Sequence, residues 1–324
     1  KEAFLAMHKT PKGKAILDAM MIEGFAEVPD KNYDSIRKME RDVIDSSRVA
    51  RTVKDNKIIH FGVIPKDNPR IMYEKYQPLL DYLAEKTPYQ YELLLKKNYE
   101  ETVNALGTGE TDLALLGPLT YLEARAKYGV VSILKARGVD GTASYKSVII
   151  VKKDLPIGTL AELKGKSIAF ASSKSTSGNL VPRYLLAGAG IHLNELGSYT
   201  NFDYHDSVVK AVLKGQYAAG AVRDSVARKY MKLGITVIAE SDAIPTGPLV
   251  AGPGTPIAVI GDIKKALLDL DPGKADGRRV LKRLDEDFKN GFTEATDKDY
   301  GDVRSKINAV PQTCGMGCHP KIKL

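Results

Sequence analysis

The sequence predicts an α/β protein built from two lobes. Short apolar segments alternate with amphipathic segments from residue 57 onward, which is the pattern of strands and helices in layered α/β folds. The alternation forms two successive sets, the second beginning at residue 168. No apolar run approaches the roughly 20 residues that a membrane-spanning helix needs. Because ligands of open α/β sheets lie at the carboxyl ends of the strands, a site is expected between the lobes.

The predicted elements follow in order along the chain. The first set has strands at residues 58–64, 89–95, 112–116, 131–136 and 145–151, with helices at 73–85, 99–106 and 119–128. The second set has strands at 168–171, 199–204, 218–222 and 235–239, with helices at 179–187, 207–213 and 224–233. One more strand after residues 244–248, and three helices between about 263 and 308, complete the pattern.

Residues 1–45 are helical in pattern and share an internal repeat with the C-terminal part of the chain. Leu17-Asp18, Gly24-Phe25, Glu27, Asp30-Lys31, Tyr33 and Arg37 recur at one constant offset as Leu284-Asp285, Gly291-Phe292, Glu294, Asp297-Lys298, Tyr300 and Arg304. Since the second copy closes a domain, residues 1–45 are predicted to be the helical tail of a preceding copy of that domain. The polar residues 46–57 are predicted to form a linker.

The stretch Ser-Ser-Lys-Ser-Thr-Ser-Gly at residues 172–178 is the clearest candidate binding loop. It follows a short apolar strand and precedes a helix, whose first backbone N–H groups have no partner within the helix. Ser175, Thr176 and Ser177 add three hydroxyl donors, and Gly178 allows a close approach of the backbone. The loop therefore predicts an anion site, with a helix cap followed by a polar turn as the alternative.

Several motifs together resemble the phosphonate-, phosphite- and phosphate-type substrate-binding proteins of bacterial ABC importers. They are Ile64-Pro65 after the first strand, Asn98-Tyr99, residues 112–118, residues 144–151, Ser-Thr-Ser-Gly-Asn-Leu-Val-Pro at 175–182, Gly291-Phe292 and Asp299-Tyr300. The resemblance implies a periplasmic-binding-protein clamshell of type II, with two mixed sheets flanked by helices and hinged by two crossover segments. Lobe 1 would comprise residues 58–147 and 247–308, and lobe 2 residues 148–246.

The same resemblance implies which residues bind the ligand. Ser175, Thr176 and Ser177 would form the hydroxyl cradle for the anion, Tyr99 and Tyr145 would complete it, and His205 and Asp224 would lie at the cleft. Alternatives remain for four of these residues: lobe packing for the two tyrosines, a surface position for His205, and a helix N-cap for Asp224.

The expected ligand is a small phosphorus oxyanion: phosphate, phosphite or a simple phosphonate. Thr246-Gly247 stands where amine-binding members of the family place an acidic residue, so an aminophosphonate is not expected. Neutral donors rather than an arginine cluster are expected to hold the anion. Asp224, if it faces the cleft, would accept a hydrogen bond from a protonated anion and would thereby reject sulfate.

The C-terminal tail, residues 309–324, contains the only two cysteines of the chain. Cys314, Cys318 and His319 resemble a c-type haem attachment site, although three residues separate the cysteines where two are usual. A local disulfide and a metal site one ligand short are the alternatives. Haem c would imply export and a redox partner, with His319 ligating the iron and His8, His60 or a Met as the second axial ligand.

Two function classes follow, and a third has no support. The first is periplasmic binding for ABC-type uptake or sensing, with an ABC permease or a membrane sensor as partner. The second is a c-type cytochrome that uses the binding-protein fold as scaffold or as a ligand-gated electron-transfer module. An enzyme is not expected, because no nucleophile–base pair or carboxylate dyad has a diagnostic spacing. Nucleic acid is not expected either, since the net charge of +8 is spread along the chain.

Because the chain begins at Lys1, a longer precursor and attachment to a membrane or surface through missing regions are expected alternatives.

Overall fold

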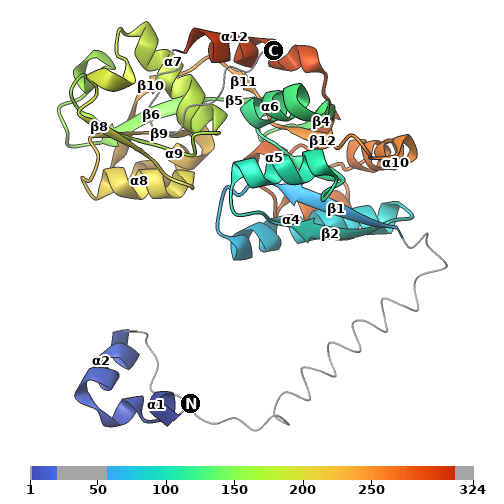
Figure 1. Ribbon diagram of the computed structural model, residues 1–324, viewed down its shortest axis with the longest axis horizontal. Coiled ribbons are helices and arrows are strands. Elements are labelled where there is room, and N and C mark those ends of the chain that lie inside the picture. Colours follow the sequence, from blue (N-terminus) through green and yellow to red (C-terminus); the bar gives the residue numbers. More distant parts are fainter. Residues whose placement is uncertain (1, 20–56, 311–324) are drawn as a thin grey trace. The chain divides into compact units, whose positions relative to one another are not determined.

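The computed structural model describes residues 2–19 and 57–310, which belong to two compact units, Lys1–Lys54 and Asp55–Leu324. In the first unit, helix α1 (Glu2–Leu5) and a 3₁₀ turn (Met7–Lys9) precede helix α2 (Pro11–Ala19) (Figure 1). Thr10 caps α2, because its hydroxyl oxygen accepts the N–H of Gly13 at 3.0 Å. Most of the predicted repeat and linker lies outside the described residues and stays a prediction.

The second unit is an α/β fold with two sheets, as predicted. The first sheet has the strand order β13-β4-β12-β3-β1-β2. Its strands are β1 (Ile58–Val63), β2 (Gln90–Leu94), β3 (Leu113–Leu115), β4 (Val131–Ala136), β12 (Pro248–Ala251) and β13 (Phe292–Glu294). β1 pairs in parallel with β2 and β3, whereas β12 is antiparallel to β3 and β4, and β13 to β4. The sheet is therefore mixed.

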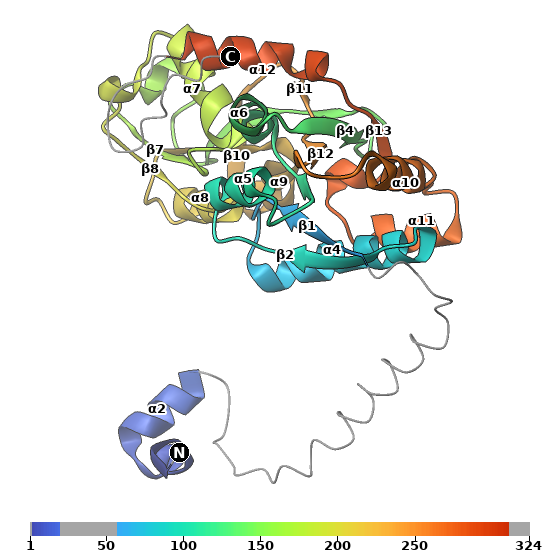
Figure 2. The same ribbon diagram turned by 45° about the vertical axis from the view of Figure 1, so that its right-hand side comes forward.

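Helices cover both faces of this first sheet (Figure 2). They are α4 (Pro69–Lys86), α5 (Tyr99–Thr108), α6 (Pro118–Tyr128), α10 (Ile257–Leu268), α11 (Ala275–Leu281) and α12 (Gly301–Ala309). Alternate strand residues enter two separate cores, because successive side chains of a strand point to opposite faces. Leu113 and Leu115 pack with α4, α10 and α11, whereas Ala114 and Leu116 pack with α5 and α6.

The second sheet has the order β10-β6-β9-β7-β8. Its strands are β6 (Ser147–Lys152), β7 (Ser167–Phe170), β8 (Ser198–Asn201), β9 (Ala219–Arg223) and β10 (Ile235–Glu240). Only β6 runs against its neighbours β9 and β10. Helix α7 (Val181–Gly188) packs on one face, and α8 (His205–Leu213) and α9 (Asp224–Tyr230) pack on the other.

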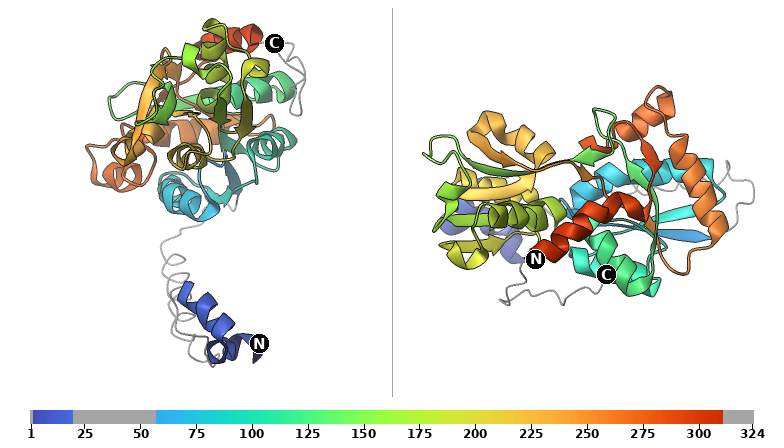
Figure 3. Two further views of the ribbon diagram at one scale, coloured as in Figure 1. Left: turned by 90° about the vertical axis from the view of Figure 1, so that its left-hand side faces the viewer. Right: turned by 90° about the horizontal axis from the view of Figure 1, so that it is seen from above.

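Two crossing segments connect the sheets. The short strands β5 (Ser144–Tyr145) and β11 (Ile244–Pro245) pair antiparallel and lead directly into β6 and β12. Helix α12 contacts both α6 and α7, so it bridges the two halves beside the crossing strands (Figure 3). The carboxyl ends of β1, β3, β7 and β9 therefore face one another across a cleft.

The C-terminal part differs from the sequence prediction in one element. The three predicted helices are present, but the strand β13 lies between α11 and α12 and extends the first sheet. Three residues are too few to show a readable alternation, and Gly291 with a φ of 72° turns the chain into the strand. None of the described helices is both long and apolar enough to cross a membrane.

Candidate functional site

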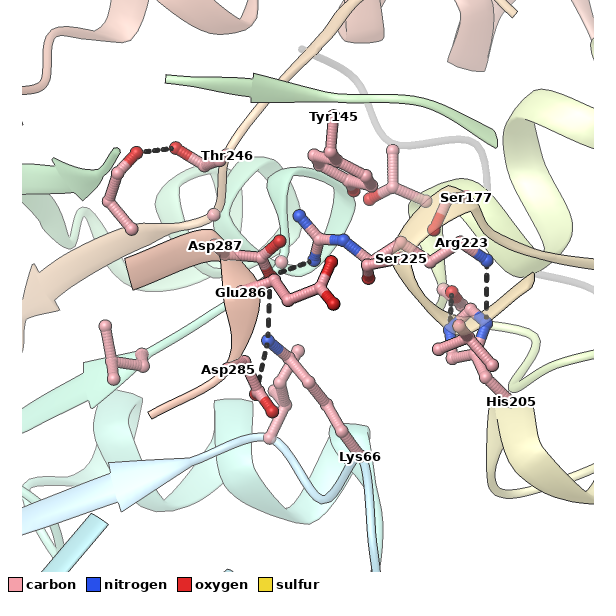
Figure 4. A pocket seen from close by; sticks show the side chains of 18 of the residues that line it. Lys66, Tyr145, Ser177, His205, Arg223, Ser225, Thr246, Asp285, Glu286 and Asp287 are labelled. Atoms are coloured by element: carbon pink, nitrogen blue, oxygen red, sulfur yellow. Dashed lines mark hydrogen bonds and ion pairs between the residues drawn. The ribbon is translucent and has the colours of Figure 1, made fainter. Parts of the chain in front are cut away.

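A cavity of about 80 Å³ lies between the two sheets, at the carboxyl ends of their strands (Figure 4). Six of the seven predicted ligand residues line it: Tyr99, Tyr145, Ser175, Thr176, Ser177 and His205. Residues that the sequence prediction did not name line it as well, among them Lys66, Lys75, Arg223, Ser225, Asp285, Glu286 and Asp287. The small volume restricts the cavity to a ligand of a few heavy atoms.

The predicted serine loop begins a helix, as the sequence pattern indicated. The Ser175 hydroxyl oxygen accepts the N–H of Gly178 at 3.0 Å, and residues Thr176–Leu180 form a single π-helical turn that continues into α7. A Cβ atom at Gly178 would lie 2.3 Å from the Ala171 Cβ and 2.8 Å from the His205 Cε1. Glycine is therefore required where this turn packs against the strand end and the histidine.

The hydrogen bonds around His205 fix the direction of the Ser175 hydroxyl. His205 Nδ1 accepts the backbone N–H of Arg223 at 3.2 Å, so in the neutral ring Nε2 carries the proton. Nε2 lies 3.3 Å from the Ser175 oxygen. That oxygen thus accepts two hydrogen bonds, from Gly178 and His205, and its own proton is available to donate into the cavity.

His205 is neutral at physiological pH. Burial, followed by the positive charges of Arg223 and Lys66, lowers the pKa of its imidazole to about 3. The ring is therefore a fixed donor that orients Ser175 and carries no charge to the site.

Thr176 and the two tyrosines supply further neutral donors. The Thr176 hydroxyl oxygen accepts the N–H of Leu119 at 2.9 Å. This hydrogen bond joins the lobe of the second sheet to the lobe of the first. The Tyr145 hydroxyl interacts with the side chains of Ser177 and Thr176. Burial raises the pKa of both Tyr99 and Tyr145, so both phenols keep the proton that they would donate to an anion.

Arg223, at the carboxyl end of β9, is the charged centre of the cavity. Its Nη1 pairs with Asp287 Oδ2 at 2.7 Å, and its guanidinium carbon lies 3.5 Å from the centroid of the Tyr145 ring. Nε and Nη2 are buried and have no hydrogen-bond partner among the described residues. These two nitrogens form one edge of the guanidinium plane, the edge that binds two oxygens of one oxyanion side by side. The cavity therefore contains one arginine beside the neutral donors that the sequence predicted.

A cluster of ion pairs holds Arg223 from the side of the first sheet. Lys66 Nζ lies 3.9 Å from a carboxylate oxygen of each of Asp285 and Asp287, and Lys75 contacts Asp285 at 2.5 Å. Burial lowers the pKa of Lys66 despite these carboxylates. Burial alone would raise the pKa of Asp285, but Lys66 and Lys75 outweigh it and hold that pKa well below its usual range.

The seventh predicted ligand residue, Asp224, is not part of the cavity lining. It begins helix α9, where its carboxylate pairs with Arg228 at 2.8 Å, one turn later on the same helix. Arg228 also pairs with Glu286 at 2.9 Å, so Asp224 contributes to a contact at the rim. The carboxylate that meets the cavity beside the guanidinium is instead Asp287.

The loop after β11 places Thr246 and Gly247 in the lining without adding a charge. The Thr246 hydroxyl donates to the backbone oxygen of Ala136 at 2.6 Å, so it is committed to the fold. Cys314, Cys318 and His319, for which the sequence predicts haem attachment, lie outside the described residues. Within residues 2–19 and 57–310, no group of three or more His, Cys, Asp or Glu could hold a metal ion.

A sequence signal for Arg223 did exist. β9 reads Ala-Gly-Ala-Val-Arg, and its carboxyl end is where a ligand of an α/β sheet is expected. A charged residue that ends such a strand is a better candidate than the next residue, which starts the following helix. Lys66 and Asp287 gave no comparable signal, because residues so far apart in sequence come together only in the folded chain.

Residues 61–300 match the family of ABC transporter, phosphonate, periplasmic substrate-binding proteins. A curated relative from Prochlorococcus marinus, named a probable ABC transporter phosphite binding protein PhnD1, is 27% identical over 184 residues, covering 54% of this chain and 61% of the relative. The phosphate-import protein PhnD of Mycolicibacterium smegmatis is 26% identical, covering 76% of this chain and 84% of that protein.

A solved structure of PhnD1 from Prochlorococcus marinus in complex with methylphosphonate shares the fold, with a TM-score of 0.71 and 23% identity. The match covers 79% of this chain and 98% of that chain. The type II clamshell predicted from the sequence motifs is confirmed by this likeness. The family match over most of the second unit, together with the fold, shows that the chain belongs to the phosphonate-binding family of periplasmic substrate-binding proteins of ABC transporters.

Proposed function

We propose that this chain binds a small phosphorus oxyanion (phosphate, phosphite or a simple phosphonate) in the periplasm, for ABC-type uptake or sensing. The observation that carries the proposal is the buried guanidinium of Arg223, a cavity-lining residue whose Nε and Nη2 have no hydrogen-bond partner within the part of the chain that the structure describes. A buried charged donor without a partner is costly unless a ligand supplies the acceptor. Two oxygens of one oxyanion are the matching acceptor.

The remaining donors favour a tetrahedral anion over a carboxylate. Ser175, Thr176 and Ser177 belong to the loop, Tyr145 to a crossing strand and Tyr99 to the first turn of α5, and all of them line the same cavity as Arg223. A carboxylate has two oxygens, which Arg223 alone would occupy, whereas a phosphorus oxyanion offers a third oxygen to the hydroxyls. The cavity of about 80 Å³ leaves little room for a larger substituent.

Asp287 gives the site a means of preferring a protonated anion. Its carboxylate lies in the lining next to Arg223, where it could accept a hydrogen bond from a P–OH group. Sulfate has no proton to give at neutral pH. The role first expected of Asp224 is therefore assigned to Asp287.

Calorimetric titration of the 324-residue chain with phosphate, phosphite, methylphosphonate and sulfate tests the proposed ligand class. Binding of at least one phosphorus oxyanion, with sulfate much weaker, is the expected result. Sulfate binding as tight as that of every phosphorus oxyanion would overturn it, and so would the absence of any binding.

Removing one hydroxyl of the loop should weaken binding by one charge-assisted hydrogen bond. Ser177→Ala and Thr176→Val are each expected to cost about 1.5–3 kcal/mol, or roughly 10- to 100-fold in affinity. Ser173→Ala is the matched control, because Ser173 belongs to the same loop but does not line the cavity. Unchanged affinity in both hydroxyl variants would contradict the assignment of the loop.

Deleting residues 1–50 should leave the oxyanion affinity intact. The deleted residues belong to the other compact unit, and every residue lining the cavity lies beyond residue 60. The titration that tests the wild type also tests the truncated chain. A loss of about tenfold or more, equal to about 1.4 kcal/mol, would mean that residues 1–50 complete the site instead of belonging to a preceding domain.

The C-terminal tail supports a second part of the proposed function, covalent attachment of haem c. Cys314 and Cys318 would form the thioethers and His319 would ligate the iron, in the order that haem attachment requires. A local disulfide is the competing state of the two thiols, but it has no need of the adjacent histidine. A redox partner, or electron transfer gated by the bound oxyanion, would follow from the haem.

A further inference from the structure

We propose that Lys66 is a second cationic ligand of the bound oxyanion, whose ammonium donates from lobe 1 to the anion that Arg223 binds from lobe 2. This inference rests on the oxyanion binding proposed above. It names a residue that lies outside every motif by which the sequence indicated the site. One anion would thereby contact a cation of each lobe.

Lys66 reaches the cavity from the carboxyl end of β1. It follows that strand after Ile64 and Pro65, and it lines the cavity. Figure 4 shows its side chain extending from the strand end toward Asp285 and Asp287. The carboxyl ends of the strands are where an α/β sheet presents its ligand-binding groups. Lys66 thus occupies in lobe 1 the kind of position that Arg223 occupies at the end of β9 in lobe 2.

The Lys66 ammonium makes no hydrogen bond to any residue that the structure describes. Its two ion-pair partners, Oδ2 of Asp285 and Oδ2 of Asp287, each lie 3.9 Å from Nζ. That distance exceeds the roughly 3.2 Å limit of an N–H···O hydrogen bond. The centroid of the Phe288 ring lies 5.7 Å away and offers no acceptor oxygen. An ammonium has three donors, so all three remain for an acceptor inside the cavity.

The two carboxylates do not depend on Lys66, because each has a closer cation. Lys75 contacts Asp285 at 2.5 Å, and Arg223 Nη1 contacts Asp287 at 2.7 Å. Burial lowers the pKa of Lys66 even though both carboxylates oppose that change. The carboxylates therefore compensate only part of the cost of burying the ammonium, and a bound anion would compensate more of it. A variant without Lys66 should still fold.

The ammonium and the guanidinium are close enough for one oxyanion to contact both. Lys66 Nζ and Arg223 Nη1 approach the same atom, Oδ2 of Asp287, at 3.9 and 2.7 Å. The two nitrogens are therefore no more than 6.6 Å apart. A charge-assisted N–H···O hydrogen bond spans about 2.8 Å, so different oxygens of one tetrahedral anion can reach the two cations.

Calorimetric titration of the full chain with phosphate, phosphite and methylphosphonate tests the assignment. Lys66→Met is expected to weaken binding of the tightest of the three by about 10- to 100-fold, because one hydrogen bond to a charged ligand is lost. Lys97→Met is the matched control and should bind like the wild type, since Lys97 is an exposed lysine of the same lobe that does not line the cavity. Wild-type affinity in Lys66→Met would overturn the role of Lys66 and leave the oxyanion binding standing. No binding by the wild type would overturn both.

Nuclear magnetic resonance of the full chain, labelled at lysine Cε and Nζ, separates a ligand contact from a purely structural role. The Lys66 signal is identified by its absence from the spectrum of Lys66→Met. Its pKa, followed by the Cε chemical shift, should rise when the tightest of the three anions saturates the site, because a contacting anion favours the charged ammonium. A pKa of Lys66 that the anion leaves unchanged would show that Lys66 pairs only with the carboxylates. That result would overturn the assignment even if Lys66→Met weakened binding.

Discussion

Replacing Arg223 with methionine is expected to weaken binding of the phosphorus oxyanion by about 10²- to 10⁴-fold. The variant removes two hydrogen bonds to a charged ligand, each of which contributes about 1.5–3 kcal/mol. Methionine keeps an unbranched apolar stem against the Tyr145 ring, so the loss should arise mainly from the guanidinium. Calorimetric titration with the tightest phosphorus oxyanion measures it.

Two further variants separate charge from geometry. Arg223→Lys keeps a positive charge but has no planar edge, so its affinity should fall between those of the wild type and Arg223→Met. Arg228→Met is the matched control, because Arg228 pairs with Asp224 and Glu286 at the rim and does not line the cavity. Wild-type affinity in a folded Arg223→Met protein would show that the unpaired edge is not the anion site.

Asp287 determines which nitrogens of the Arg223 guanidinium remain without a partner. Its carboxylate pairs with Nη1, while Nε and Nη2 have no hydrogen-bond partner among the residues that the structure describes. The two residues come from different lobes, since Arg223 ends β9 of the second sheet and Asp287 precedes β13 of the first. The ion pair therefore joins the two lobes across the cavity.

The local parts of the site could be predicted from the sequence, and the long-range parts could not. Ser175, Thr176 and Ser177 form a binding loop because a strand, hydroxyl residues and a helix start follow one another within a short segment. Likewise, Asn98 caps helix α5 by accepting the N–H of Glu101, which places Tyr99 at the first turn of that helix. Such features depend on neighbours in the chain.

Arg223 and Asp224 show where local reasoning fails. The two residues are adjacent, and the family motif favoured the carboxylate, but the strand ends at Arg223 and the helix begins at Asp224. If the end of the strand is placed one residue too late, Asp224 is assigned to the cavity in place of Arg223, although Asp224 lies at the rim. Lys66 and Asp287 were missed for a different reason, because only the packing of lobe 1 brings β1 and the segment before β13 together.

The unliganded protein is expected to lose about 2 kcal/mol of unfolding free energy between pH 7 and pH 5 through His205 alone. Its pKa is about 3 in the folded chain, below the ordinary value of 6.5, because burial and the charges of Arg223 and Lys66 oppose protonation. Within this window the unfolded chain therefore binds more protons than the folded chain. Stability falls as the pH falls, by up to about 1.4 kcal/mol per pH unit, until the folded pKa is reached.

Urea unfolding of haem-free protein at pH 7 and pH 5 measures this loss. His205→Gln should lose about 2 kcal/mol less than the wild type over the same interval, because glutamine can still accept the Arg223 N–H but cannot bind a proton. Asn194→Gln, at an exposed residue that binds no proton, is the matched control and should lose as much as the wild type. Asp285 does not confuse the comparison, since its pKa is held low and its ordinary value of 3.8 lies below the window. Equal losses in His205→Gln and the wild type would contradict this prediction. They would mean that His205 takes up a proton in the folded chain, although its ring is buried beside the serine loop.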